Sequence, residues 1–309
     1  MDGQRFTSTG VLSLLVRGLR RVDPALVAEI AVPDPMDRAV TPDAVKRTLI
    51  DRALREHGPG ALLAAGQEMD RAEDTPVLTV LRQSPDPAVI AAKWMRLERY
   101  SHASHRSRIT SEAAALRCTR ISRGAPASAG ENWLIAGILF GLVTGAGYAD
   151  ARLRIAGQEV TRETWAAVRT GTPTDVFSIH WTARARTAPA PARDATPGDR
   201  LTDILISDPG RGWRIAEAAG LLSVSARSLQ RHLAREGRSW STELRRARMR
   251  EAVRLLGTDA GLADIGYCCG YADQAHFQRD FRRVTNLTPR RFRQIAAEGA
   301  VGEVGAKFQ

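Results

Sequence analysis

The stretch from Gly270 to Gln294 reads GYADQAHFQRDFRRVTNLTPRRFRQ and places six arginines and three phenylalanines around a Thr-Pro break. Phe277 and Phe281 lie four residues apart, which is the spacing of one helix face. Asp273 stands where an N-cap residue would begin that helix, and Gly270 supplies a turn before it. The pattern predicts two short helices joined by a turn, with the aromatic rings inside and the polar side chains between them outside.

A similar arrangement precedes it between Ile215 and Gly237, IAEAAGLLSVSARSLQRHLAREG. The small Ala219 lies inside a first helix, and Ser225 can cap a second helix after a short turn. Leu229 and Leu233 would then point inward from that second helix. The spacing lets two helices cross closely, so this segment also predicts a helix-turn-helix unit.

The outward faces of the two second helices carry arginine and glutamine, which reach guanine O6/N7 and adenine N6/N7 in the major groove of DNA. The candidate DNA-binding residues are Arg227, Gln230 and Arg231 in one unit and Gln274, His276, Gln278 and Arg279 in the other. An arginine-rich amphipathic helix is more often only a solvated face. Two such units are harder to dismiss, because the helix predicted between them, Thr242 to Leu256, is roughly 22 Å long and could hold two reading helices in major grooves about 34 Å apart.

The composition supports a soluble globular chain with a basic C-terminal third. The 309 residues are 43% hydrophobic and 26% charged, with a net charge of +11, and 42 of the 45 basic residues are arginine. Residues 200–297 hold 18 arginines against 10 acidic residues. This concentration is typical of a module that binds a polyanion.

The segment ARARTAPAPARDATPGDR, residues 183–200, reads as an extended linker because its prolines interrupt small residues. We therefore expect a domain at 1–182, a linker at 183–199, an all-α domain at 200–297 and a disordered tail at 298–309. Helices are predicted downstream at 199–207, 213–222, 225–236, 242–256, 262–269, 273–284 and 289–297.

Residues 1–182 predict an α+β domain. Apolar residues recur at helical spacing over 11–30, 44–55 and 88–100, with Thr41 or Asp43 as the cap of the second helix and Pro42 early in it. Alternation predicts strands at 151–155 and 175–181, and 114–122 is a further strand candidate. A buried helix is predicted between them at 131–144. The apolar run WLIAGILFGLV is too short to cross a bilayer, and no secretory signal is recognised, so we expect a cytoplasmic protein without a membrane partner.

Other chemistries have weak support in the sequence. His102 and His105 with Cys118 could suggest a metal site, but no further ligand completes the set, so we expect no metal and no other cofactor. Cys118 is interpreted as a buried strand cysteine rather than a reactive thiol. The glycine-rich GLVTGAG, residues 141–147, follows a helix instead of a strand, which is the reverse of a phosphate-binding loop.

Residues 200–297 resemble the DNA-binding domain of the AraC/XylS family of bacterial transcription regulators. The resemblance rests on SLQRHLAREG, RMREAVRLL and, above all, GYADQAHFQRDFRRVTNLTPRRFR. It implies that Arg227, Gln230, Arg231, Gln274 and Arg279 read bases while His276 and Gln278 flank the backbone. Three positions depart from the family pattern: Ser223 and Asn286 stand where glycine is common, and Gly266 where alanine is usual. Glycine lowers helix propensity by about 1 kcal/mol relative to alanine, so Gly266 predicts that the second unit is the looser one.

Residues 10–182 are similar in layout to the ligand-binding half of ornithine-utilisation and virulence regulators. The resemblance implies an unknown small-molecule effector, a homodimer and RNA polymerase as partners besides double-stranded DNA. The leading hypothesis is a sequence-specific transcription regulator without enzymatic activity. The family resemblance implies that it acts as an activator. Two alternatives remain open: a small-molecule-modifying enzyme domain fused to a DNA-binding module, and an architectural DNA binder without an effector.

Overall fold

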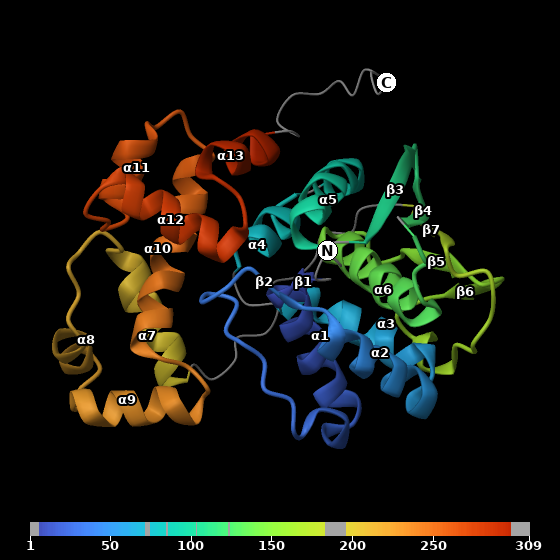
Figure 1. Cartoon of the computed structure of the whole chain (residues 1–309), viewed down its shortest axis with the longest axis horizontal. Helices are drawn as coiled ribbons and strands as arrows, with labels where there is room; N and C mark the ends of the chain where they lie inside the picture. Colours follow the sequence, from blue (N-terminus) through green and yellow to red (C-terminus); the bar gives the residue numbers. More distant parts are fainter. Residues whose placement is uncertain are drawn as a thin grey trace.

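The structure is a computed structural model that describes residues 6–71, 75–84, 86–102, 104–122, 124–182 and 196–297. Most of the expected linker, residues 183–195, and the whole expected tail, residues 298–309, lie outside the described residues. Figure 1 shows helices α7–α13 on the left, strands β3–β7 on the right, and the helices of the N-terminal part between them.

The N-terminal part combines helices with two antiparallel sheets. Its helices are α1 (Thr9–Val22), α2 (Ala44–His57), α3 (Pro59–Gln67), α4 (Pro76–Arg82), α5 (Pro87–Ser101) and α6 (Ala129–Gly145). Its strands are β1 (Phe6–Ser8), β2 (Val40–Pro42), β3 (His105–Glu112), β4 (Ala115–Ser122), β5 (Arg152–Ile155), β6 (Gln158–Val160) and β7 (Val176–His180). The α+β class predicted for this part is confirmed.

The larger sheet has the strand order β3-β4-β7-β5-β6, and its neighbouring strands run antiparallel. Cys118 pairs with Phe177, and Leu153 pairs with Ile179. These four side chains are at most 2% exposed, because alternate residues of each strand face the helices. Burial raises the pKa of Cys118 to about 12, so this thiol is a packing residue and not a reactive one.

Helix α6 is buried along almost its whole length, as expected from its continuous apolar sequence. It packs closely on α3, where Gly66 and Gly137 let the two backbones approach. A Cβ atom added at Gly66 would lie 2.3 Å from the backbone carbon of Gly137. None of the described helices is long and apolar enough to cross a membrane.

The structure corrects two details of the sequence interpretation. The helix predicted over 11–30 ends at Val22, because Asp23 is extended and Pro24 begins a separate short 3-10 helix. Pro42 lies in strand β2 and not in helix α2, although Asp43 is the N-cap of that helix. The strands β1, β2, β3 and β6 and the helices α3 and α4 were not predicted.

All seven helices expected in the C-terminal part are present. They are α7 (Pro197–Ser207), α8 (Ile215–Leu221), α9 (Ala226–Arg235), α10 (Trp240–Leu256), α11 (Leu262–Cys268), α12 (Gln274–Thr285) and α13 (Pro289–Ala297). We call α7–α9 the first unit and α11–α13 the second unit. The long helix α10 joins them (Figure 1).

The two units differ in where their cores belong. Buried side chains of the first unit, including Leu201, Leu229 and Leu233, form a separate cluster with Ala247 of α10. The buried side chains of the second unit are continuous with the core of the N-terminal part. The second unit is therefore packed onto the N-terminal part, whereas the first unit is held through α10.

Candidate DNA-binding surface

The first unit has the helix-turn-helix geometry that its sequence predicts. Ser223 takes a φ of 58°, in the left-handed region that the turn requires and that glycine usually fills. Ser225 caps α9 by accepting a hydrogen bond from the backbone N–H of Ser228. Leu229 and Leu233 are fully buried, so the opposite face of α9 is left for solvent.

That opposite face carries the candidate residues of the first unit. Arg227, Gln230 and Arg231 are all exposed, within a single turn of α9. Side chains at these positions lie on the face turned away from the core, since the buried leucines fix the rotation of the helix. All three side chains are therefore accessible on one face of α9.

The second unit is built in the same way around aromatic rings. Asp273 accepts a 2.6 Å hydrogen bond from the backbone N–H of His276, which fixes the start of α12. Phe277 and Phe281 are fully buried, and Phe281 meets Phe292 of α13 edge to face at 5.1 Å. Gly270 has the positive φ that its place in the turn predicts, 75°.

Most candidate residues of the second unit are also exposed. Gln274, His276 and Arg279 lie in solvent, while Gln278 is half-buried. The His276 ring meets the edge of Tyr271 with ring centroids 5.1 Å apart. This contact holds the His276 ring beside the helix cap, while Gln274 and Arg279 are exposed at the start and in the middle of α12.

The departures from the family pattern have local physical explanations. Asn286 ends α12 in the left-handed conformation at a φ of 60°, which asparagine tolerates better than most residues. Gly266 lies where α11 crosses α12, and a Cβ atom there would stand 3.2 Å from the Cβ of Phe277. Glycine at this position therefore permits a close helix crossing. Whether the second unit is looser stays a prediction.

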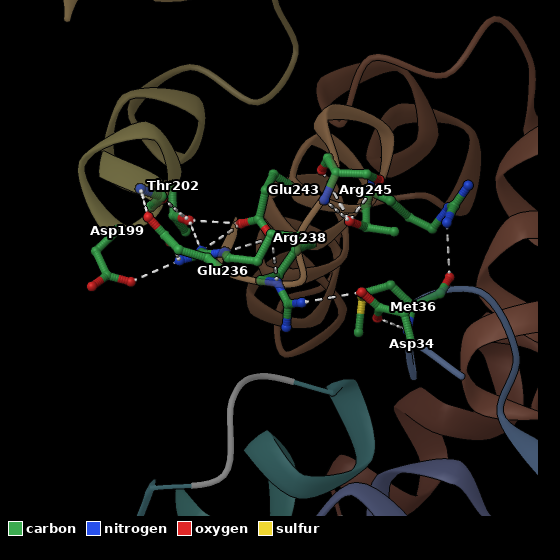
Figure 2. A network of polar contacts seen from close by, with 12 residues as sticks. Asp34, Met36, Asp199, Thr202, Glu236, Arg238, Glu243 and Arg245 are labelled. Atoms are coloured by element: carbon green, nitrogen blue, oxygen red, sulfur yellow. Dashed lines mark hydrogen bonds and ion pairs between the residues drawn. The ribbon is translucent and has the colours of Figure 1, made fainter. Parts of the chain in front are cut away.

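A polar network around the buried Glu243 holds α10 against the first unit (Figure 2). The Arg238 guanidinium binds Glu243 through two nitrogens, at 3.0 and 2.7 Å, and Asp199 of α7 at 2.9 Å. Thr202 donates a 2.8 Å hydrogen bond to Glu243, whose side chain is completely buried. Burial by itself would raise the pKa of Glu243, but the hydrogen bond from Arg238 and the positive charge of Arg246 outweigh it and lower that pKa.

A second set of contacts joins α10 to the N-terminal part. Arg245 Nη1 donates to the backbone oxygen of Met36 at 3.0 Å and lies 2.6 Å from an Asp37 carboxylate oxygen. Arg245 Nε also lies 3.5 Å from Asp280 of α12. Figure 2 shows Arg245 facing the loop that carries Met36. One arginine thus connects an N-terminal loop, the joining helix α10 and helix α12 of the second unit.

The end of α12 is bound to the end of α5. Asn286 Nδ2 donates to the backbone oxygen of Tyr100 at 2.8 Å, and Arg291 Nε lies 3.2 Å from the Tyr100 hydroxyl. The Ala39 backbone N–H donates to the oxygen of Arg283 at 2.8 Å. Sequence reasoning missed these contacts, because nothing local marks Tyr100 or Ala39 as a neighbour of a helix far along the chain.

Comparison with known proteins finds similarity over the C-terminal part of the chain. The family described as a helix-turn-helix domain matches residues 218–295. Transcriptional regulator SirC of Salmonella typhimurium is 39% identical over 98 residues, which cover 31% of this chain and 33% of that protein. The urease operon transcriptional activator of Escherichia coli is 31% identical over 101 residues, or 32% and 34% of the two chains. The chain thus spans about a third of the length of these relatives.

Two solved structures are similar over comparable lengths. A DNA-binding transcriptional dual regulator from Escherichia coli K-12 is 24% identical with a TM-score of 0.34, covering 35% of this chain and 99% of that chain. A transcriptional regulator with an AraC-type DNA-binding domain from Chromobacterium violaceum is 25% identical with a TM-score of 0.32, covering 33% and 93%.

The fold and the family match define a helix-turn-helix protein with two such units. The chain carries this domain at its C-terminal end, and the domain is of the AraC/XylS type. The family match covers residues 218–295 and the relatives cover about a third of the chain, so the resemblance of residues 10–182 stays a prediction.

Proposed function

We propose that the protein is a transcription regulator that binds double-stranded DNA in a sequence-specific manner. The observation that carries the proposal is the pair of exposed arginine and glutamine faces on α9 and α12, joined by one helix. Helix α10 has 17 residues and is therefore about 25 Å long. Its length and its anchoring at both ends support simultaneous contact with two successive major grooves.

Base reading would come from five of the candidate residues. Arg227, Arg231 and Arg279 carry the donors that bind guanine, and Gln230 and Gln274 those that bind adenine. His276 and Gln278 would flank the phosphate backbone. The surrounding arginines would add affinity that falls with salt, because phosphate contacts release counterions.

The test is to measure binding of Arg279→Ala to a DNA site selected from random oligonucleotides by the wild-type protein. We expect a loss of about 1 to 3 kcal/mol on the selected site and a relaxed preference at one base pair. Arg152→Ala is the matched control, since Arg152 is an exposed arginine on the N-terminal sheet and should leave DNA binding unchanged. An equal loss on every sequence would remove Arg279 from base reading, and equal binding of all sequences by the wild-type protein would favour an architectural DNA binder.

We further propose that residues 1–182 bind a small-molecule effector and pass its effect to the DNA-binding domain at 200–297. The support is the shared core of the second unit and the N-terminal part, together with the contact between Tyr100 and Asn286. A ligand that shifts α5 would shift the end of the second reading helix with it. A thermal-shift screen of metabolites tests this, because a ligand at a hundredfold excess over its Kd stabilises the fold by about 2.7 kcal/mol.

The remaining assignments follow from the same proposal. The relatives are named as transcription regulators or activators, which supports a regulator without enzymatic activity. RNA polymerase and a second copy of the chain are proposed partners by family resemblance, and the cytoplasm is the proposed location. Turnover of a small molecule by the purified full chain would instead support the enzyme alternative.

A further inference from the structure

Two histidines and a glutamate meet in the interior of the N-terminal part. His102 follows the last turn of α5, His105 begins β3, and Glu131 lies in the first turn of α6. His105 Nδ1 is 3.1 Å from Glu131 Oε2, and His102 Nε2 is 3.7 Å from Glu131 Oε1. The sequence suggested Cys118 as the partner of the two histidines, whereas the structure places Glu131 beside them.

These three side chains have the arrangement of a metal-ligand set. One ligand atom from each lies within 4.8 Å of the others, and all three residues are buried. Ligand bonds of about 2.0–2.2 Å around Zn²⁺ place neighbouring donor atoms roughly 3.4 Å apart in a tetrahedron. The distances from His105 Nδ1 to Glu131 Oε2 and from His102 Nε2 to Glu131 Oε1, 3.1 and 3.7 Å, are close to that value, although they end on different oxygens of the carboxylate.

The hydrogen bonding of His105 leaves a place for a cation. Its Nε2 lies 3.4 Å from the backbone oxygen of Ala125. A metal-binding histidine commonly donates the N–H that faces away from the metal to such a carbonyl oxygen. A neutral ring has one N–H, so a proton on Nε2 directed at Ala125 leaves a bare Nδ1 facing a carboxylate oxygen. Nδ1 is buried and has no hydrogen-bond partner of adequate geometry. A metal ion between Nδ1 and Glu131 would satisfy both groups.

Lys46 would compete with a metal ion for His102 and Glu131 through its ammonium group. Its ammonium lies 2.8 Å from His102 Nε2 and 2.9 Å from Glu131 Oε1, so it acts as a cation on the same two ligands. A divalent ion beside a fixed ammonium would be strongly repelled, because both charges are buried. Metal binding therefore requires Lys46 Nζ to move aside.

The adjoining cavity gives room for that movement and limits the ligand. It is lined by Lys46, His102 and Glu131 among others and has a volume of about 30 Å³. This is the space of about one water molecule, so it admits a displaced ammonium or a metal-bound water but no organic metabolite.

We propose that His102, His105 and Glu131 form a binding site for a divalent transition-metal ion, with Lys46 as the displaceable cation of the metal-free state. Two imidazoles and one carboxylate are donors suited to Zn²⁺ and its neighbours in the first transition row. The fourth position would be taken by a water molecule from the cavity. This proposal differs from the expectation from sequence that the histidine pair binds no metal.

The test uses the full chain without a histidine tag, stripped with a chelator and then titrated with Co²⁺ and Zn²⁺. We expect one ion per chain and the visible absorption of a Co²⁺ site with nitrogen ligands. His105→Gln and Glu131→Gln should each weaken binding by at least the roughly 10- to 100-fold that loss of a hydrogen-bond partner of a ligand costs, because each removes a ligand itself. His180→Ala is the matched control, because His180 lies on the same sheet and binds Ser178 outside the cluster.

Lys46→Met separates this proposal from a merely structural cluster. Removing the competing cation should tighten metal binding by about tenfold, whereas loss of a structural ion pair alone would not. Thermal melts of each variant verify folding, and His102→Gln replaces any ligand variant that fails to fold. Absence of stoichiometric binding by the wild-type chain, or binding that His105→Gln and Glu131→Gln leave unchanged, overturns the site. Unchanged or weaker binding by Lys46→Met overturns the role of the lysine.

The site lies close to the contact between the N-terminal part and α12, so metal binding could alter DNA binding. This extension rests on the proposed function. His102 lies two residues beyond Tyr100, whose oxygen accepts the hydrogen bond from Asn286. We expect Zn²⁺ to change the Kd for the selected DNA site in the wild-type chain and not in His105→Gln. If the metal binds but the Kd for DNA does not change, the effect on DNA binding is refuted and the metal site is retained. If the protein does not bind DNA at all, the proposed function itself is refuted.

Discussion

Replacing Glu243 by leucine should destabilise the first unit by about 3 kcal/mol. The Glu243 carboxylate is fully buried and accepts from two nitrogens of Arg238 and from the hydroxyl of Thr202. Leucine fills similar space but offers no acceptor, so the Arg238 guanidinium, whose side chain is 12% exposed, loses its principal partner.

The magnitude follows from what Arg238 keeps. Removing one partner of a buried ion pair costs about 3 to 5 kcal/mol, because the other charge stays desolvated. Arg238 retains Asp199 at 2.9 Å, Glu236 at 3.4 Å and the Thr202 hydroxyl at 2.7 Å, so the lower end of that range applies. Glu56→Leu is the matched control: it breaks an exposed pair with Arg52, and such pairs contribute about 0 to 1 kcal/mol.

Urea unfolding and amide hydrogen exchange together check this prediction. The free energy of unfolding should fall in the variant, and exchange should rise first in α7–α9, because the first unit has its own core. Amides of α11–α13 should stay protected, since that unit shares the N-terminal core. A loss below about 1 kcal/mol, or equal loosening of both units, would refute the reasoning.

Two further perturbations test the packing and the charge of the fold. The pKa of Glu243 is lower in the folded protein than its ordinary value of 4.5. The ionised carboxylate therefore stabilises the fold above pH 4.5, and this stabilisation is lost as the pH falls from 4.5 through the folded pKa. Acid unfolding of Glu243→Gln, followed by circular dichroism, should lack this part of the pH dependence. Gly66→Ala should cost about 3 kcal/mol or more in chemical unfolding, because the new Cβ would meet the Gly137 backbone at 2.3 Å and force α3 from α6. Gly220→Ala, where nothing lies within 4 Å, should cost nothing, and a similar loss in both variants would contradict the packing argument.

The sequence alone determined the C-terminal helices and the exposed faces of α9 and α12. The signals are local: helix caps such as Ser225 and Asp273, and pairs such as Phe277 with Phe281, involve residues only a few positions apart. They can therefore be recognised in the sequence without knowledge of the tertiary structure. Alternation also predicted β5 and β7, and β4 was a further strand candidate. It missed β1 and β2, because three-residue strands carry too little pattern and depend on pairing between distant segments.

Only the tertiary structure decided how the N-terminal part meets the second unit and which groups gather inside it. Asn286 and Tyr100 are 186 residues apart, and Arg245 and Asp37 are 208 apart, so no local pattern links them. Glu131 completes the histidine pair only because α6 packs beside the junction of α5 and β3. Helix periodicity and capping are short-range effects that sequence records directly, whereas the meeting of distant side chains depends on how whole elements pack.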